Sequence, residues 1–442
     1  AARHVKEISD LVKNNKIGGL IFFQGGPVRQ ANLTNKYQKL SKVPLMISID
    51  GEWGLAMRLD STIKYPKQMT LGAIENDSLI YQMGRDIALQ CKRIGIHVNL
   101  APVADVNNNP LNPVIGVRSF GENKEAVARK AAMYMKGMQD AGVMANAKHF
   151  PGHGDTDSDS HKTLPVINYS QAHLDSFELY PFRQLIGQGL GSMMVAHLFI
   201  PAYDTTRNTA TTLSKNVVTG LLKDSMQFKG LVFTDALDMK GVSKFYGPGE
   251  INVKALLAGN DVLLFAEDVP NAILLIKKAI AEGKITQDEI DQRCKKILYA
   301  KQWCGLNHYK PVKTKNLYED LNNPKYDWVL RQLADASVTV LQNKNSILPL
   351  MNMDTVKAAS LCIGLKNETD FQRMAANYAT IKSFNIDRDA KNAERDSMIS
   401  KLKNYNTILV TINNTNVKLK DNFGITPLAE ALLDTLSRMN KK

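Results

Sequence analysis

The chain has 442 residues, of which 44% are hydrophobic and 22% charged, so it has ample material for a large buried core. Its 56 Lys and Arg residues outnumber its 43 Asp and Glu residues and give a net charge of +13. The basic residues are spread along the chain without an Arg-rich arm, so we expect a solvated basic surface and no nucleic-acid partner. No apolar run reaches the roughly 18 residues that a membrane span requires, so we expect no such span.

Seven short apolar runs recur along the first part of the chain. They cover residues 17–25, 43–50, 96–106, 143–150, 191–201, 230–237 and 260–265. Most neighbouring runs are separated by amphipathic stretches of helical period, such as residues 124–141 and 213–228. Near-continuous apolar strands that alternate with helices predict an α/β fold with a parallel sheet covered by helices. Seven strands in about 270 residues fit a (β/α)8 barrel of the TIM type better than an open sheet.

Several of these runs end in polar residues of types that take part in catalysis. These residues are Asp50, Asp105, Lys148, His149, His197 and Asp235. Because the active sites of such barrels lie at the carboxyl ends of the strands, these residues together predict one pocket rim. For Asp105 and His197, a buried and hydrogen-bonded polar group or a helix N-cap is an equally good interpretation.

The densest group of polar residues is KHFPGHGDTDSDSHKTLP, residues 148–165. Its three alternating aspartates resemble the start of a calcium loop, but such a loop needs Gly at its sixth position and Glu at its twelfth, where this chain has Ser160 and Val166. The four cysteines lie far apart in the sequence and no HExxH motif is present, so we expect no metal and no cofactor. A structural polar loop remains the alternative to an active-site loop.

Four segments, in their order and spacing, resemble glycoside hydrolase family 3 and in particular its β-N-acetylglucosaminidase branch. The segments are IDGEWGLAMRL (residues 49–59), NPVIGVRSFG (112–121), KHFPGHGDTDSDSHKTLP (148–165) and FTDALDMKGV (233–242). A further segment, ASVTVLQNKNSILPL (336–350), is similar to the opening of the family's second domain. The resemblance implies a TIM-barrel catalytic domain at residues 1–305, a linker at 306–335 and an α/β sandwich domain at 336–442.

Both ends of the chain differ from the family pattern. Family members open with an additional strand, whereas this chain opens with a helix-like stretch at residues 4–15. Beyond residue 350, the strand candidates are residues 358–364 and 407–412, followed by a helical stretch at the end. We therefore expect a trimmed chain, with the first barrel strand missing or atypical and only a partial sandwich. No signal segment is recognisable, so the compartment stays open between the cytoplasm and the cell envelope.

The resemblance implies that Asp235 is the nucleophile, whose carboxylate attacks the anomeric carbon to give a covalent glycosyl-enzyme. Asp238, three residues on, matches no catalytic position of the family. The resemblance also implies that His161 is the general acid/base, with Asp159 as its dyad partner. Most glycosidases use two carboxylates, but a histidine with an unperturbed pKa of about 6.5 can protonate a leaving group and then deprotonate water near neutral pH. A neighbouring carboxylate favours its protonated form.

The resemblance further implies five substrate-binding residues, namely Asp50, Arg58, Arg118, Lys148 and His149. Charged side chains suit this task because hydrogen bonds to ions are stronger than those between neutral groups. Lys148 and His149 are consecutive and would point to opposite faces of a regular strand, so we predict an irregular backbone at this strand end. Trp53 stands where many family members have a glycine, and we expect it to form an apolar wall on the acceptor side.

Three hypotheses for the function follow. The first is a retaining exo-β-N-acetylglucosaminidase that releases terminal GlcNAc from peptidoglycan- or chitin-type fragments and works as a monomer or weak oligomer. The second is a family 3 phosphorylase of β-N-acetylglucosaminides or β-glucosides, because a histidine acid/base would not repel phosphate as a carboxylate does. The third is a glycan-binding module without turnover. The set of Asp235, Asp159 and His161 argues against the third, because a binding module does not need a nucleophile.

Overall fold

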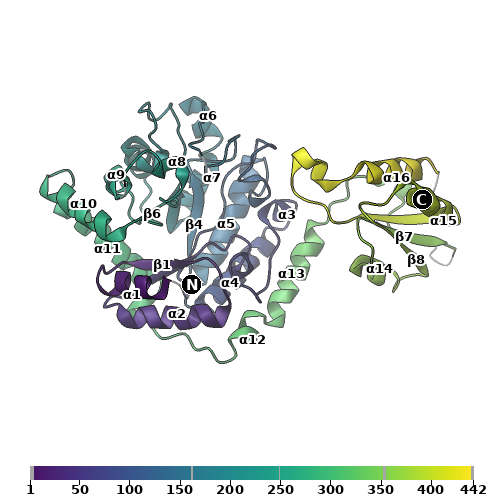
Figure 1. Cartoon of the computed structure of the whole chain (residues 1–442), viewed down its shortest axis with the longest axis horizontal. Helices are drawn as coiled ribbons and strands as arrows, with labels where there is room; N and C mark the ends of the chain where they lie inside the picture. The colour runs from purple at the N-terminus through teal and green to yellow at the C-terminus, as the bar shows by residue number, and fades with distance from the viewer. Residues whose placement is uncertain (1–3, 161–162, 248, 352–354, 440–442) are drawn as a thin grey trace. The chain divides into compact units, whose positions relative to one another are not determined.

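The computed structural model describes residues 4–160, 163–247, 249–351 and 355–439. The chain divides into two compact units, Ala1–Val338 and Thr339–Lys442, and each has its own parallel sheet (Figure 1). Within the described ranges, no helix is both long enough and apolar enough to cross a lipid bilayer. The residues predicted to carry the function all belong to the first unit.

The first unit contains a parallel sheet of six strands, in which neighbours in sequence are neighbours in space. The strands are β1 (Gly19–Phe22), β2 (Met46–Ile49), β3 (Val98–Asn99), β4 (Met144–Phe150), β5 (Ser192–Val195) and β6 (Leu231–Thr234). The seventh apolar run continues this order through a bridge between Phe233 and Val262. The strand order is that of a (β/α) barrel, and the curled sheet forms part of one. The predicted fold class is confirmed, and six of the seven apolar runs contain strands, whereas the run at 260–265 forms only an isolated bridge.

Helices alternate with the strands as this fold requires, one before β1 and the others after it (Figure 1). They are α1 (Val5–Lys13), α2 (Pro27–Leu40), α3 (Gln68–Gly72), α4 (Ser78–Arg93), α5 (Lys124–Asp140), α6 (Gln171–Ser176), α7 (Tyr180–Gly187), α8 (Lys240–Ser243), α9 (Glu250–Ala258), α10 (Val269–Ala281) and α11 (Gln287–Trp303). The predicted helical start of the chain is α1, and the stretch 124–141 becomes α5. The stretch 213–228 is helical as well, but its helix, Asn216–Ser225, has the wider turn of a π-helix.

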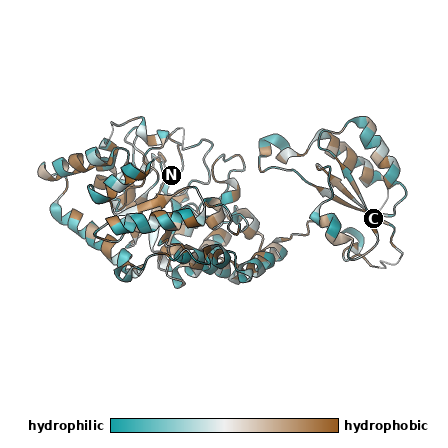
Figure 2. Ribbon diagram, turned by 60° about the horizontal axis from the view of Figure 1, so that its bottom comes forward, coloured by the Kyte–Doolittle hydropathy of each residue, from teal (hydrophilic) through white to brown (hydrophobic). Residues whose placement is uncertain are grey.

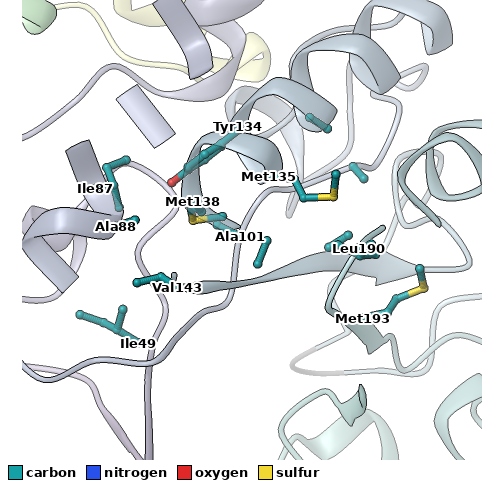
Figure 3. Packing of buried hydrophobic residues seen from close by; sticks show 14 of the residues in the cluster. Ile49, Ile87, Ala88, Ala101, Tyr134, Met135, Met138, Val143, Leu190 and Met193 are labelled. Atoms are coloured by element: carbon teal, nitrogen blue, oxygen red, sulfur yellow. The ribbon is translucent and has the colours of Figure 1, made fainter. Parts of the chain in front are cut away.

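Helices α4 and α5 pack closely because glycines lie where their backbones meet. A Cβ atom at Gly84 would come within 2.4 Å of the carbonyl oxygen of Tyr134, and one at Gly137 within 2.1 Å of that of Tyr81. The two helices contribute to one large buried cluster (Figure 3), whose members include Ile87, Ala88, Tyr134, Met135 and Met138. This packing holds α4 and α5 against the strands whose ends carry the candidate site.

Both faces of the sheet are buried. One face joins the cluster beneath the helices, and the other forms a second cluster that includes Met46, Val98, Met144, Met194, Leu231 and Phe233. Figure 2 shows the strands as mainly hydrophobic, whereas the surrounding helices carry hydrophilic residues as well. Burial on both faces explains why the strands appear in the sequence as continuous apolar runs rather than as alternating ones.

Residues 306–335, expected as a linker, contain α12 (Leu317–Leu321) and α13 (Pro324–Ser337). Leu317, Leu321 and Leu333 belong to the large buried cluster of the first unit. The side-chain amide of Gln90 on α4 donates a hydrogen bond of 2.9 Å to the carbonyl oxygen of Leu321. Residues 306–335 are therefore part of the first unit and pack next to α4.

The second unit contains a three-stranded parallel sheet in the order β8-β7-β9. Its elements are β7 (Ala358–Ile363), α14 (Asp370–Ala375), β8 (Ile381–Ile386), α15 (Asn392–Leu402), β9 (Thr407–Ile412) and α16 (Pro427–Arg438). The two strand candidates of the sequence are confirmed as β7 and β9, and the final helical stretch as α16. Strand β8 was not predicted, because Lys382, Ser383 and Asn385 interrupt its apolar residues, whereas β9 has the more apolar sequence TILVTI.

Candidate active site

The carboxyl ends of the strands bring the predicted polar residues of the first unit together. Asp50 directly follows β2, Lys148 and His149 lie at the end of β4, and Asp235 directly follows β6. Arg58 ends a short 3-10 turn after β2 (Leu55–Met57), and Arg118 ends a similar turn after β3 (Gly116–Arg118). Parallel strands end at the same edge of a sheet, so these side chains converge on one region.

The backbone at the end of β4 is irregular, as predicted. The peptide bond between Lys148 and His149 is cis, and the pairing of β4 with β5 shifts register across this step. Lys148 Nζ lies 2.5 Å from Asp50 Oδ1, and His149 Nδ1 lies 2.7 Å from Asp105 Oδ2. Both side chains are buried. The side chains of Lys148 and His149 therefore both contact carboxylates at the carboxyl ends of the strands, although the two residues are consecutive.

Glu52 is a member of the site that the sequence analysis missed. Only 1% of this residue is exposed, and its carboxylate lies 2.6 Å from Arg118 Nη2 and 2.9 Å from Lys148 Nζ. Burial raises the pKa of Glu52, but the charges of Arg118 and Lys148 outweigh burial and lower it below its ordinary value. The signal in the sequence was charge balance, because one buried and one partly buried cation in the same pocket need more carboxylate than Asp50 alone provides.

The ion pairs form one continuous charged network. It consists of Arg58, Asp50, Lys148, Glu52, Arg118, His149 and Asp105. Arg58 also lies over the ring of Phe23, with 4.3 Å between its guanidinium carbon and the ring centroid. Trp53 is only partly buried, and its ring is 5.3 Å from Lys67 Nζ. The five predicted binding residues therefore lie in the network, whereas an acceptor-side wall at Trp53 remains a prediction.

We expect Glu52→Gln to lower the free energy of unfolding by about 3 kcal/mol, because removing this carboxylate leaves the buried Lys148 and the partly buried Arg118 insufficiently neutralised. Urea unfolding at pH 7 measures the change. Glu282→Gln is the matched control, since Glu282 is an exposed glutamate that pairs with Lys284 at 2.7 Å, and we expect little effect there. A Glu52 variant as stable as the control would show that the charged network is not preformed.

Asp105 and His197 are buried, hydrogen-bonded polar groups, which was one of the two interpretations of the sequence. Asp105 is fully buried and accepts hydrogen bonds from the backbone N–H groups of His149 and His153 as well as from the His149 ring. The ring of His197 lies 2.9 Å from the Thr212 hydroxyl and donates to the carbonyl oxygen of Ala236 at 2.9 Å. His197 thus fixes the turn that follows Asp235.

Asp235 is held at the end of β6 in an ionised state. Its backbone N–H bonds to the carbonyl oxygen of Val195, and its Oδ1 accepts from the N–H of Ala236 at 2.8 Å. Burial raises the pKa of Asp235, but the charges of His197 and His149, with this N–H group, outweigh burial and lower it. Asp238, by contrast, is exposed on the following turn. Asp235 therefore offers a carboxylate to the site at neutral pH.

The loop after β4 lies against the segment that follows Asp235. A Cβ atom at Gly241 of α8 would come within 2.4 Å of the carbonyl oxygen of Ser160. The carbonyl oxygen of Asp159 accepts from the backbone N–H of Thr163 at 3.0 Å. His161 lies outside the described residues, so the Asp159–His161 dyad stays a prediction. Among the residues that are described, no group of three or more His, Cys, Asp or Glu side chains is arranged to hold a metal ion.

Residues 1–300 match the family described as "Glycosyl hydrolase family 3 N terminal domain". The chain belongs to glycoside hydrolase family 3. Beta-hexosaminidase A from Pseudoalteromonas piscicida is 31% identical over 379 residues, which are 78% of this chain and 62% of that protein. Beta-hexosaminidase LpqI from Mycobacterium tuberculosis is 34% identical over 262 residues, which are 57% of this chain and 66% of that protein. The chain thus spans less than two thirds of these relatives.

Solved structures of the family share the fold. A family 3 β-N-acetylglucosaminidase from Paenibacillus sp. str. FPU-7 superposes with a TM-score of 0.79 at 30% identity, over 98% of this chain and 84% of that one. The β-glucoside phosphorylase BglX superposes with a TM-score of 0.77 at 23% identity, over 90% of this chain and 76% of that one. The second similarity concerns the fold alone. The resemblance of the four sequence segments to family 3 is confirmed.

Proposed function

We propose that this chain is a retaining exo-β-N-acetylglucosaminidase that releases terminal β-linked GlcNAc from peptidoglycan- or chitin-type fragments. The observation that carries the proposal is an ionised Asp235 beside a network of charged side chains at one end of the barrel. The names of the relatives support it, since beta-hexosaminidases are similar to this chain over much of its length. The similar structure from Paenibacillus supports the same choice of sugar.

In the first step, the carboxylate of Asp235 attacks the anomeric carbon while the bond to the leaving oxygen breaks. His161 donates its proton to that oxygen, and the sugar remains as an ester on Asp235. In the second step, a water molecule attacks the anomeric carbon and His161 takes a proton from it. The ester bond breaks, Asp235 leaves as a carboxylate, and GlcNAc is released with the configuration of the substrate.

The charged network supplies the sugar-binding groups. Arg118, Lys148 and His149 donate hydrogen bonds to hydroxyl and acetamido oxygens, and Asp50 accepts them from hydroxyls. Glu52 and Asp105 hold the donors in place before the sugar arrives, so less ordering is needed on binding. A site with its donors fixed in advance can strengthen its contacts as charge develops on the ring in the transition state.

An assay with p-nitrophenyl β-GlcNAc and p-nitrophenyl β-glucoside, each with and without phosphate, tests the proposal. We expect kcat/KM for the GlcNAc substrate to exceed that for the glucoside by about 100-fold. Glucose lacks the acetamido group, so the side chains that bind this group would have no hydrogen-bond partner when the glucoside is bound. We expect phosphate to have no effect on rate or product. A sugar phosphate as the main product would indicate a phosphorylase, and binding without turnover would indicate a glycan-binding module.

A further inference from the structure

His153 is a buried histidine that neither step of the proposed reaction uses. It is 1% exposed, and both of its ring nitrogens have hydrogen-bond partners. Nδ1 lies 2.8 Å from the hydroxyl oxygen of Thr156, and Nε2 lies 3.0 Å from that of Ser160. These two hydroxyls stand on either side of residues 157–159 in the loop that carries Asp159. A single imidazole ring therefore joins the two arms of this loop.

The backbone of His153 is fixed on the opposite side. Its N–H donates to Asp105 Oδ1 at 2.8 Å, and its carbonyl oxygen accepts from Asn112 Nδ2 at 2.8 Å. Asn112 Oδ1 in turn accepts from the backbone N–H groups of Val114 and Ile115, which sets the orientation of its amide. His153 is therefore attached to the charged network and to the turn before Arg118, neither of which belongs to the loop.

The ring of His153 is suited to holding hydroxyls rather than to exchanging protons. Burial, aided by the charge of the nearby His149, lowers the pKa of His153 to about 4. The ring is thus neutral near pH 7, with one nitrogen that donates and one that accepts. A hydroxyl can serve as the partner of either nitrogen, so Thr156 and Ser160 satisfy both.

Ser160 is in addition held from the other side. Its carbonyl oxygen lies against Gly241, where a Cβ atom would approach it to 2.4 Å and the carbonyl oxygen of Thr163 to 2.7 Å. Ser160 itself is only 2% exposed. Ser160 directly follows Asp159 in the sequence, so the placement of Ser160 constrains the backbone at Asp159.

We propose that His153 is a positioning residue, which holds Ser160 and thereby Asp159 next to the segment that follows Asp235. This inference rests on the function proposed above. Its consequence is specific to proton transfer, because the charged network and Asp235 are anchored independently of the loop. Loss of the ring nitrogens should therefore weaken general acid catalysis more than it weakens sugar binding.

The test compares His153→Phe, which keeps a ring and removes its hydrogen bonds, with His153→Gln, whose amide can still bond one hydroxyl. For a β-GlcNAc substrate with a poor leaving group, such as the methyl glycoside, we expect kcat/KM of His153→Phe to fall about 100-fold. The dinitrophenolate leaving group of dinitrophenyl β-GlcNAc departs without a proton donor. For this substrate we expect kcat/KM to fall less than about fivefold. His153→Gln should recover part of the loss. His308→Phe is the matched control, because His308 is exposed and lies near His97 and Gly142, which precede β3 and β4 at the opposite end of these strands from the candidate site.

Ser160→Ala provides a second route in case His153→Phe fails to fold. We expect the same uneven loss, and in the double variant the two losses on the poor substrate should not add. Equal losses on both substrates, or additive losses in the double variant, would overturn the positioning role. If the wild-type enzyme releases no GlcNAc, or if Asp235→Ala stays active, the proposed function itself is wrong and the positioning role is rejected with it.

Discussion

Asp235→Ala should lower kcat on p-nitrophenyl β-GlcNAc by at least about 10³-fold while the protein stays folded. The change removes the carboxylate that forms the ester, and no described group next to it offers a second nucleophile of the same type. Steady-state kinetics measure the loss, and circular dichroism with thermal unfolding checks the fold. Because Asp235 is surrounded by positive charge, its removal should slightly alter stability without disturbing the hydrophobic clusters.

Asp238→Ala is the matched control for this variant. Asp238 lies three residues away on the turn after β6, and its side chain is exposed. We expect it to keep most of the wild-type activity. If the two variants exchanged behaviour, so that Asp238→Ala were inactive and Asp235→Ala active, the assignment of the nucleophile would be wrong.

His161→Ala should produce a loss that depends on the leaving group. For substrates with poor leaving groups we expect kcat/KM to fall about 10³-fold, because the proton donor is missing, and for activated aryl glycosides by less than about tenfold. With activated substrates the glycosyl-enzyme should accumulate, since its hydrolysis lacks a base. Added azide should then accelerate turnover, because it attacks without base assistance. Rates across a series of aryl β-GlcNAc substrates measure the pattern.

Asp159→Ala should follow the same pattern more mildly, since the carboxylate orients the imidazole and favours its charged form without taking a proton. Losses of equal size across the series, with no response to azide, would mean that another residue is the acid/base. The loop after β4 would then only shape the pocket.

The strands and the positions at their ends could be predicted from the sequence for a simple reason. A strand buried on both faces has an uninterrupted apolar run, and a polar side chain at its carboxyl end breaks that run at a defined place, as Asp50 and Asp235 do. The irregular step between Lys148 and His149 followed from the period of a strand together with the binding roles that the resemblance to family 3 implied for both residues. Each of these features depends on residues that are close in the sequence.

Other features depend on contacts between distant segments and left no local signal. Glu52 is in the site because Arg118 and Lys148 come to it from two other strand ends. The role of His153 depends on Asn112 and on the fold of its own loop. Polar residues interrupt the apolar residues of strand β8, so its sequence has no apolar run to mark it. The apolar residues of the segment 306–335 are buried in one cluster with residues of α4. The sequence alone does not reveal this contact.

The central claim is that Asp235 forms a covalent bond with the sugar, and mass spectrometry can test it directly. The His161→Ala protein is incubated with dinitrophenyl β-GlcNAc, quenched in acid and digested with a protease. The masses of the resulting peptides then show which peptide carries a sugar. We expect one N-acetylhexosamine unit on the peptide that contains Asp235, absent from a sample treated with azide before quenching. A sugar attached to any other residue, or a protein that turns over the substrate without an adduct and releases the inverted anomer, would contradict the account.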